Sequence, residues 1–236
     1  MVSSEHTQKS FDADLGKLHS AIVELGDMVS KELDAAMDAL SHHDANEAAE
    51  VGDVDISVNL KERHIDDLAI RIIALRQPMA TDLRFIISSL QIARDLERIG
   101  DYAENIADHT LTLAQMGDTG VEAKIVELGA KVKAMLAEIL ETFTSRDVKR
   151  ALEIRNRDVE NDSLYTDIFR ELLNMNCGAK GKSSACVHLL FVARSLERIG
   201  DHITNIAEHV VYIVTGKVPA DSRPKADLTA FLMAEE

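Results

Sequence analysis

The sequence predicts an all-α protein: a tandem duplication of an antiparallel three-helix bundle, with six long helices. Three observations support this prediction. The 236-residue chain has only 3 Pro and 11 Gly, its apolar residues recur at helical spacing, and a segment near residue 100 returns near residue 200. Ala, Leu and Glu, which favour helix, are abundant, whereas aromatic residues make up only 4% of the chain.

The internal repeat is clearest in one segment. Residues 93–109 read ARDLERIGDYAENIADH and residues 193–209 read ARSLERIGDHITNIAEH, so that 12 of 17 positions are identical at an offset of 100. Upstream, IVELG occurs at 22–26 and again at 125–129, an offset of 103. Both halves therefore keep the same order of elements. We expect a first bundle over residues 1–117, a second over 118–216 and a C-terminal tail over 217–236.

The first half divides into three predicted helices. The first covers residues 11–40 and ends in Ser-His-His-Asp, the second covers 45–76 and is stopped by Gln77-Pro78, and the third covers 81–115. Because short turns connect them, consecutive helices should be antiparallel neighbours.

The second half repeats this division. We expect helices over residues 121–144, 148–174 and 183–215, with a glycine-containing turn at 176–181 in place of the proline turn. The tail contains Pro219 and Pro224, and we expect it to be a loose end or a short extra helix.

Composition excludes several functional classes. The formal net charge is −15, which argues against a nucleic-acid partner because such proteins carry a basic footprint. Cys177 and Cys186 are nine residues apart and form neither a disulfide framework nor a zinc motif. The N-terminus lacks the pattern of a signal peptide, and no apolar run is long enough to cross a bilayer. We therefore expect a cytoplasmic protein.

The repeated segment carries carboxylates on one helix face. Glu97 and Asp101 are four residues apart, so their side chains lie one above the other, and Glu197 and Asp201 do the same in the second half. Stacked carboxylates repel each other unless a positive charge lies between them. Gly100 and Gly200, although unfavourable inside a helix, are present in both copies, which indicates close approach by a neighbouring helix or by an ion.

Counting residues outward from the helical turns predicts what faces these carboxylates. Asp158 and Asp162 should lie at the level of Glu197 and Asp201, and Asp55 and Asn59 at the level of Glu97 and Asp101. The result would be one carboxylate cage in each half. The predicted metal ligands are Asp55, Glu97, Asp101, Asp158, Asp162, Glu197 and Asp201.

Oxygen-only ligands suit Mg²⁺, Mn²⁺, Ca²⁺ or iron better than metals that prefer thiolates. Two interpretations compete with a metal site. The acidic stripe can be a solvated helix face, or it can be neutralised without metal by Arg94, Arg98, Arg194 and Arg198. His109 and His209 are repeated too, but they lie two turns further on, where packing or surface roles fit better.

The sequence resembles the PhoU family of bacterial phosphate-uptake regulators. The resemblance rests on RIIALRQP at 71–78, followed by ATDLR at 80–84, and on the two LERIGD segments at 96–101 and 196–201. It covers nearly the whole chain. It implies two three-helix bundles that bind magnesium, manganese, zinc or iron through the seven acidic residues named above. Asn59 stands where a further carboxylate is possible, which puts equal occupancy of the two sites in doubt.

The resemblance further implies a non-enzymatic role. Such a protein represses the phosphate-starvation response by connecting the ATPase subunit of a Pst-type phosphate ABC transporter to a PhoR-type sensor histidine kinase. It would act as a homodimer, peripheral to the inner membrane through its partners. Two alternatives remain: a carboxylate-bridged metal enzyme with oxidase or phosphohydrolase activity, and a purely structural helical adapter. The first lacks the Glu-x-x-His pattern of ferritin-like di-metal bundles.

Overall fold

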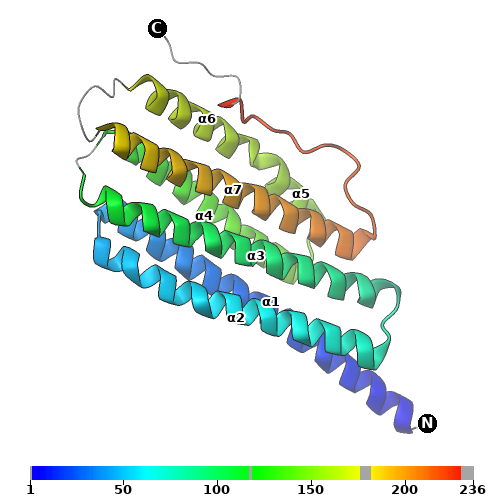
Figure 1. Ribbon diagram of the computed structural model, residues 1–236. Coiled ribbons are helices and arrows are strands. Elements are labelled where there is room, and N and C mark those ends of the chain that lie inside the picture. Colours follow the sequence, from blue (N-terminus) through cyan, green and yellow to red (C-terminus); the bar gives the residue numbers. More distant parts are fainter. Residues whose placement is uncertain (1, 117–118, 176–181, 230–236) are drawn as a thin grey trace.

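The computed structural model describes residues 2–116, 119–175 and 182–229, in which every regular element is a helix (Figure 1). The first half forms α1 (Val2–His42), α2 (Ala45–Arg76) and α3 (Ala80–Leu113). The second half forms α4 (Glu122–Ser145), α5 (Val148–Arg157), α6 (Val159–Asn174) and α7 (Lys182–Thr215). The all-α prediction is confirmed. The predicted turn at 176–181 and Gly117–Asp118 lie outside the described residues.

Corresponding turns in the two halves are capped alike. Asp44 accepts hydrogen bonds from the amides of Asn46 and Glu47 at the start of α2, and Asp147 accepts one from the amide of Arg150 at the start of α5. At the end of α2, Gln77 adopts a left-handed conformation (φ 48°) and its N–H is bonded to the carbonyl of Ile73. Pro78 then prevents the helix from continuing.

The structure differs from the sequence-based expectations in one detail of a helix and in the path of the tail. The predicted helix 148–174 is interrupted at Asp158, which separates α5 from α6 although its dihedral angles (φ −59°, ψ −20°) remain right-handed. The Asp158 carboxylate at this interruption lies against Gly200 of α7. The tail is neither a loose end nor a helix over residues 217–228, since it runs back in extended form along α6 and α7 (Figure 1).

The two halves lie side by side, with α3 antiparallel to α7 at the centre (Figure 1). Isoleucine, leucine and alanine side chains from all the helices form a continuous core. Polar groups also cross between the halves: Asp95 Oδ1 on α3 lies 2.8 Å from Nδ1 of His202 on α7, and His109 Nδ1 lies 3.1 Å from Nδ1 of His188. His209 Nε2 also lies 3.6 Å from Asp95 Oδ2, so His109 and His209 both contact the other half.

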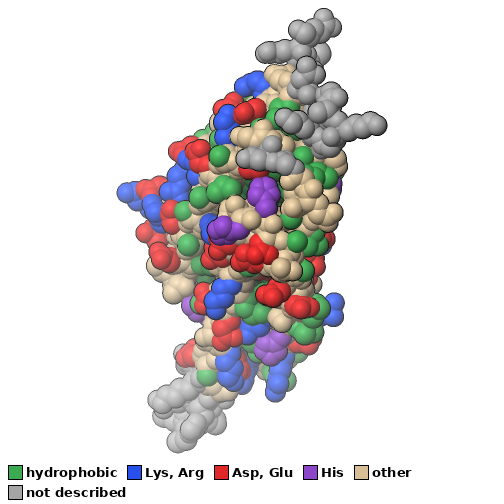
Figure 2. Space-filling view, turned by 90° about the vertical axis from the view of Figure 1, so that its left-hand side faces the viewer, with side chains coloured by type: hydrophobic (Ala, Val, Ile, Leu, Met, Phe, Trp, Pro, Cys, Tyr) green, Lys and Arg blue, Asp and Glu red, His purple; other side chains and the backbone are tan. Residues whose placement is uncertain are grey.

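The outer surface mixes charges of both signs. The end of the bundle seen in Figure 2 carries acidic side chains interspersed with Lys, Arg and His. None of the helices, over the residues described, is long and apolar enough to cross a membrane.

Candidate functional site: two acidic sites between helices

The first acidic site lies between α1, α2 and α3. Asp55 on α2 approaches Glu97 and Asp101 on α3, as the sequence predicts, and the three carboxylates repel one another. Glu32 from α1 and Glu104 from α3 complete the group, because both lie close enough to act on Asp55. We define the first acidic site as Glu32, Asp55, Glu97, Asp101 and Glu104.

Glu32 is the most deeply buried member of this site. Its side chain is 0% exposed, and neither carboxylate oxygen has a hydrogen-bond partner among the described residues. Burial, reinforced by the charges of Asp55, Glu104 and Asp101, raises the pKa of Glu32 to about 8. Such a group is unfavourable unless it is protonated or meets a cation.

Asp55 shares this shortage of partners. Its Oδ2 accepts a hydrogen bond of 2.7 Å from Nδ2 of Asn59, but its Oδ1 is buried and has none within the described part of the chain. Burial and the charge of Asp101 raise the pKa of Asp55. Asn59 thus orients Asp55. At the repeat offset of 103, Asn59 stands where the second half has Asp162, and Glu32 brings a further carboxylate to the first site.

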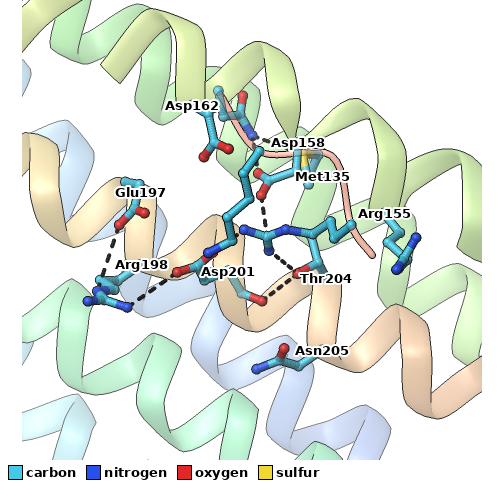
Figure 3. Close-up of polar contacts among 12 residues, drawn as sticks. Met135, Arg155, Asp158, Asp162, Glu197, Arg198, Asp201, Thr204 and Asn205 are labelled. Carbon is cyan, nitrogen blue, oxygen red and sulfur yellow. Dashed lines mark hydrogen bonds and ion pairs between the residues drawn. The ribbon is translucent and has the colours of Figure 1, made fainter. Parts of the chain in front are cut away.

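The second acidic site consists of Asp158, Asp162, Glu197 and Asp201. Figure 3 shows the first two, from the junction of α5 and α6, pointing toward the last two on α7. Asp158, Asp162 and Glu197 are buried, and the side chain of Asp201 is 15% exposed. All four predicted residues therefore converge, as the helix register requires.

The pKa values of the carboxyl groups in the second site are shifted in different directions. Burial raises the pKa of Asp158 to about 6, although Asn161 and Arg223 oppose the change, and burial together with Asp201 raises that of Glu197 to about 7. Burial also acts on Asp201, but the hydrogen bond and charge of Arg223 outweigh it and lower the pKa of Asp201. The difference arises because a cation from the tail reaches only part of the site.

Arginines of the repeated helix pair with both sites. Arg98 lies 2.8 Å from Asp101 and 3.5 Å from Glu97, and Arg198 makes the equivalent contacts at 3.3 and 3.8 Å. Arg194 adds a contact of 3.1 Å to Glu197. These pairs neutralise the outer rim of each site, so the arginine interpretation explains part of the acidic stripe. They leave the buried oxygens of Glu32 and Asp55 without partners.

Gly100 and Gly200 make room for the carboxylates. A Cβ on Gly100 would stand 3.0 Å from Glu32 Oε2 and 3.6 Å from Asp55 Oδ1, and one on Gly200 would stand 2.6 Å from Asp158 Oδ1. Both glycines thus let the carboxylates of the facing helices lie against α3 or α7. This close approach explains why each copy tolerates an unfavourable residue inside its helix.

The donor chemistry of the first site fits a hard cation. It offers only oxygen atoms, three of them buried without hydrogen bonds, next to a glycine that leaves space. No three His, Cys, Asp or Glu side chains in the described ranges are already arranged around a common metal position. Binding would therefore require these side chains to rotate toward one another.

Two contributors were missed by reading the sequence. Glu32 could have been found, because it interrupts the apolar series Leu25, Val29 and Ala36 on the buried face of α1. At the repeat offset of 103 its counterpart is Met135, an ordinary core residue. Arg223 carried no such signal, since it lies in an irregular segment with no repeat counterpart.

Comparison with known proteins identifies the family. The family description "PhoU domain" matches residues 22–110 and 125–210, one match in each half. The chain belongs to the PhoU family. A relative from Zymomonas mobilis, named "Phosphate-specific transport system accessory protein PhoU homolog", is 40% identical over 226 residues, which cover 95% of either chain. A relative of the same name from Rhizobium meliloti is 40% identical over 98% of each chain.

Solved PhoU structures share the fold. The crystal structure of PhoU from Pseudomonas aeruginosa superimposes with a TM-score of 0.85 at 36% identity, covering 88% of this chain and 100% of that one. The phosphate transport system regulatory protein PhoU from Streptococcus pneumoniae gives 0.82 at 29% identity, covering 89% and 99%. The tail, residues 217–236, lies outside both PhoU domain matches.

Proposed function

We propose that the chain is a non-enzymatic, metal-binding regulator of phosphate uptake. In this proposal it connects the ATPase subunit of a Pst-type phosphate ABC transporter to a PhoR-type sensor histidine kinase. It represses the phosphate-starvation response when phosphate is plentiful. The observation that carries the proposal is membership of the PhoU family over nearly the whole chain, with relatives named as accessory proteins of the phosphate-specific transport system.

The acidic sites support the metal-binding part of the proposal. Glu32, Asp55, Glu97 and Asp101 would hold a divalent or ferric ion in the first site. Asp158, Asp162, Glu197 and Asp201 would hold one in the second. Magnesium, manganese, zinc and iron are the candidates. A bound ion would neutralise the buried carboxylates and tie α1, α2 and α3 together. The carboxylates would supply the charge, Asn59 would keep Asp55 oriented, and Gly100 would leave space for their oxygens.

The experiment that tests this function is a pull-down with the tagged full-length chain. The transporter's ATPase subunit and the kinase are offered separately, each with and without EDTA. We expect both partners to be retained without chelator and to be lost with it. An Asp101→Asn, Asp201→Asn double variant should behave like the EDTA-treated protein. If the partners are retained equally with EDTA and with the double substitution, the interaction does not depend on metal. Failure to capture either partner would contradict the adapter role.

A cellular measurement separates regulation from catalysis. Deleting the gene should switch on a phosphate-starvation reporter in phosphate-rich medium, and the wild-type chain should restore repression. Phosphoester hydrolysis or iron oxidation by the purified protein that disappears in Glu97→Ala would favour the enzyme alternative instead. The homodimer and the peripheral membrane location belong to the same proposal and are checked by light scattering and by cell fractionation.

A further inference from the structure

The C-terminal segment lies on the second acidic site. After α7, Gly216 (φ 71°) turns the chain, and the segment then runs parallel to α5 and α6 (Figure 1). Arg155 Nη2 donates to the carbonyl of Asp221 at 2.7 Å, and the amide of Ala226 donates to Asp162 Oδ2 at 3.0 Å. Thr166 Oγ1 accepts from the amide of Leu228 at 3.2 Å. Backbone groups thus hold residues 221–228, which we call the strap, along the site.

The strap places a guanidinium among the carboxylates. Arg223, whose side chain is 11% exposed, forms an ion pair with Asp201, lies 3.4 Å from Asp158 Oδ2 and donates to the hydroxyl of Thr204. Lys225 lies 3.5 Å from the same Asp201 oxygen. Asp227 completes the attachment by pairing with Arg194 at 3.2 Å. Arg223 therefore reaches two of the four carboxylates that define the second site.

The first acidic site lacks two of the residues that hold the strap on the second. At the repeat offset of 103, Arg155 corresponds to Gly52, and at the offset of 100, Thr204 corresponds to Glu104. The first half thus has neither the arginine that anchors the strap nor the hydroxyl that accepts from Arg223. It has a glycine and a carboxylate instead. The two copies have diverged so that, among the described residues, a cationic side chain from the tail enters only the second site.

We propose that the strap is an internal ligand of the second acidic site, and that it competes there with a divalent cation. Both need the oxygens of Asp158 and Asp201, and a guanidinium and a metal ion repel each other at this range. By linkage, the strap lowers the affinity of the second site for the cation by the same factor by which the cation weakens the strap. The competition rests on the metal binding proposed above, whereas the docking of the strap does not.

The test uses the full-length chain with Mn²⁺ as the probe. The first acidic site is disabled by Asp101→Asn, so that binding reports the second site. In that background, Arg223→Gln should raise the Mn²⁺ affinity about tenfold, as measured by calorimetry, and Arg223→Lys should return it toward the starting value. Arg170→Gln is the matched control because it removes the same charge from α6, where Arg170 pairs only with exposed Asp167 among the described residues.

Hydrogen exchange supplies a second readout. Mn²⁺ should accelerate exchange of the Ala226 and Leu228 amides in the chain that retains Arg223. Equal Mn²⁺ affinity in Arg223→Gln and Arg170→Gln, or strap amides that stay protected when Mn²⁺ is bound, would overturn the competition and leave metal binding intact. Absence of Mn²⁺ binding both in Arg223→Gln and in the wild-type chain would overturn the competition together with the metal part of the proposed function.

Discussion

Glu32 on α1 lies directly against Gly100 on α3: a Cβ on that glycine would stand 3.0 Å from Glu32 Oε2. This contact brings a buried carboxylate from the first helix into a site that the repeated segment alone does not complete. The second half has no equivalent, because Met135 takes the place of Glu32. The predictions that follow test the consequences of this asymmetry.

Glu32→Gln should stabilise the metal-free protein at high pH. Burial raises the pKa of Glu32 from its ordinary value near 4.5 to about 8, so the folded protein holds this proton more tightly than the unfolded chain does. The resulting stabilisation is complete below about pH 4.5 and is lost as the pH rises toward about 8. Glutamine stays neutral throughout, and we expect its melting temperature at pH 8.5 in EDTA to exceed the wild-type value by roughly 5 °C.

The advantage of Glu32→Gln should shrink toward zero as the pH falls to about 4.5. Glu24→Gln is the control, since Glu24 lies on the same helix with an exposed side chain paired to Lys61. A pH-independent difference between Glu32→Gln and wild type would contradict the assignment of Glu32 as the buried titrating group.

Replacing Asp101 and Asp201 together by alanine should remove bound metal while leaving the helices intact. Both side chains lie at the edge of their sites, 29% and 15% exposed, so their loss opens little of the core. Elemental analysis of protein purified without chelator measures the metal, and circular dichroism measures the helices. Collapse of the helical signal would mean instead that the ions hold the bundle together.

Alanine at Gly100 or Gly200 should weaken cation binding without unfolding the protein. Each substitution favours the helix by about 1 kcal/mol, but the new methyl group displaces Glu32 or Asp158. We expect Mn²⁺ affinity at the affected site to fall on the order of tenfold, or about 1.4 kcal/mol. Gly16→Ala on α1 is the control because a Cβ there meets nothing within 4 Å. Wild-type affinity in both variants would show that the glycines serve only helix packing.

Arg155→Met should destabilise the second half. Arg155 is 2% exposed, and it donates to Glu208 Oε1 and to the carbonyl of Asp221, each at 2.7 Å. Losing these bonds should cost about 1–3 kcal/mol, visible as a lower midpoint of thermal unfolding. Arg150→Met, which removes only exposed pairs with Glu138 and Glu153, should cost less than about 1 kcal/mol. Equal losses in the two variants would refute a special role for Arg155.

Much of the fold could be predicted because its signals are local. Helical periodicity and the Gln77-Pro78 stop act over a few residues, and the helices that they predict at 45–76 and 81–115 are present as α2 and α3. The break at Asp158 escaped prediction because no proline or glycine marks it. At this residue the Asp158 carboxylate lies against Gly200 of α7, a tertiary contact that no local pattern in the sequence shows.

The sequence by itself determined that the chain is a duplicated helical bundle and that Asp158 and Asp162 face Glu197 and Asp201. Helical spacing and short turns impose these relationships whatever the rest of the molecule does. Only the tertiary structure decided that Glu32 joins the first site and that Arg223 enters the second. Those contacts join residues from helices and segments that meet only after packing, and the burial that unites them changes their charge states.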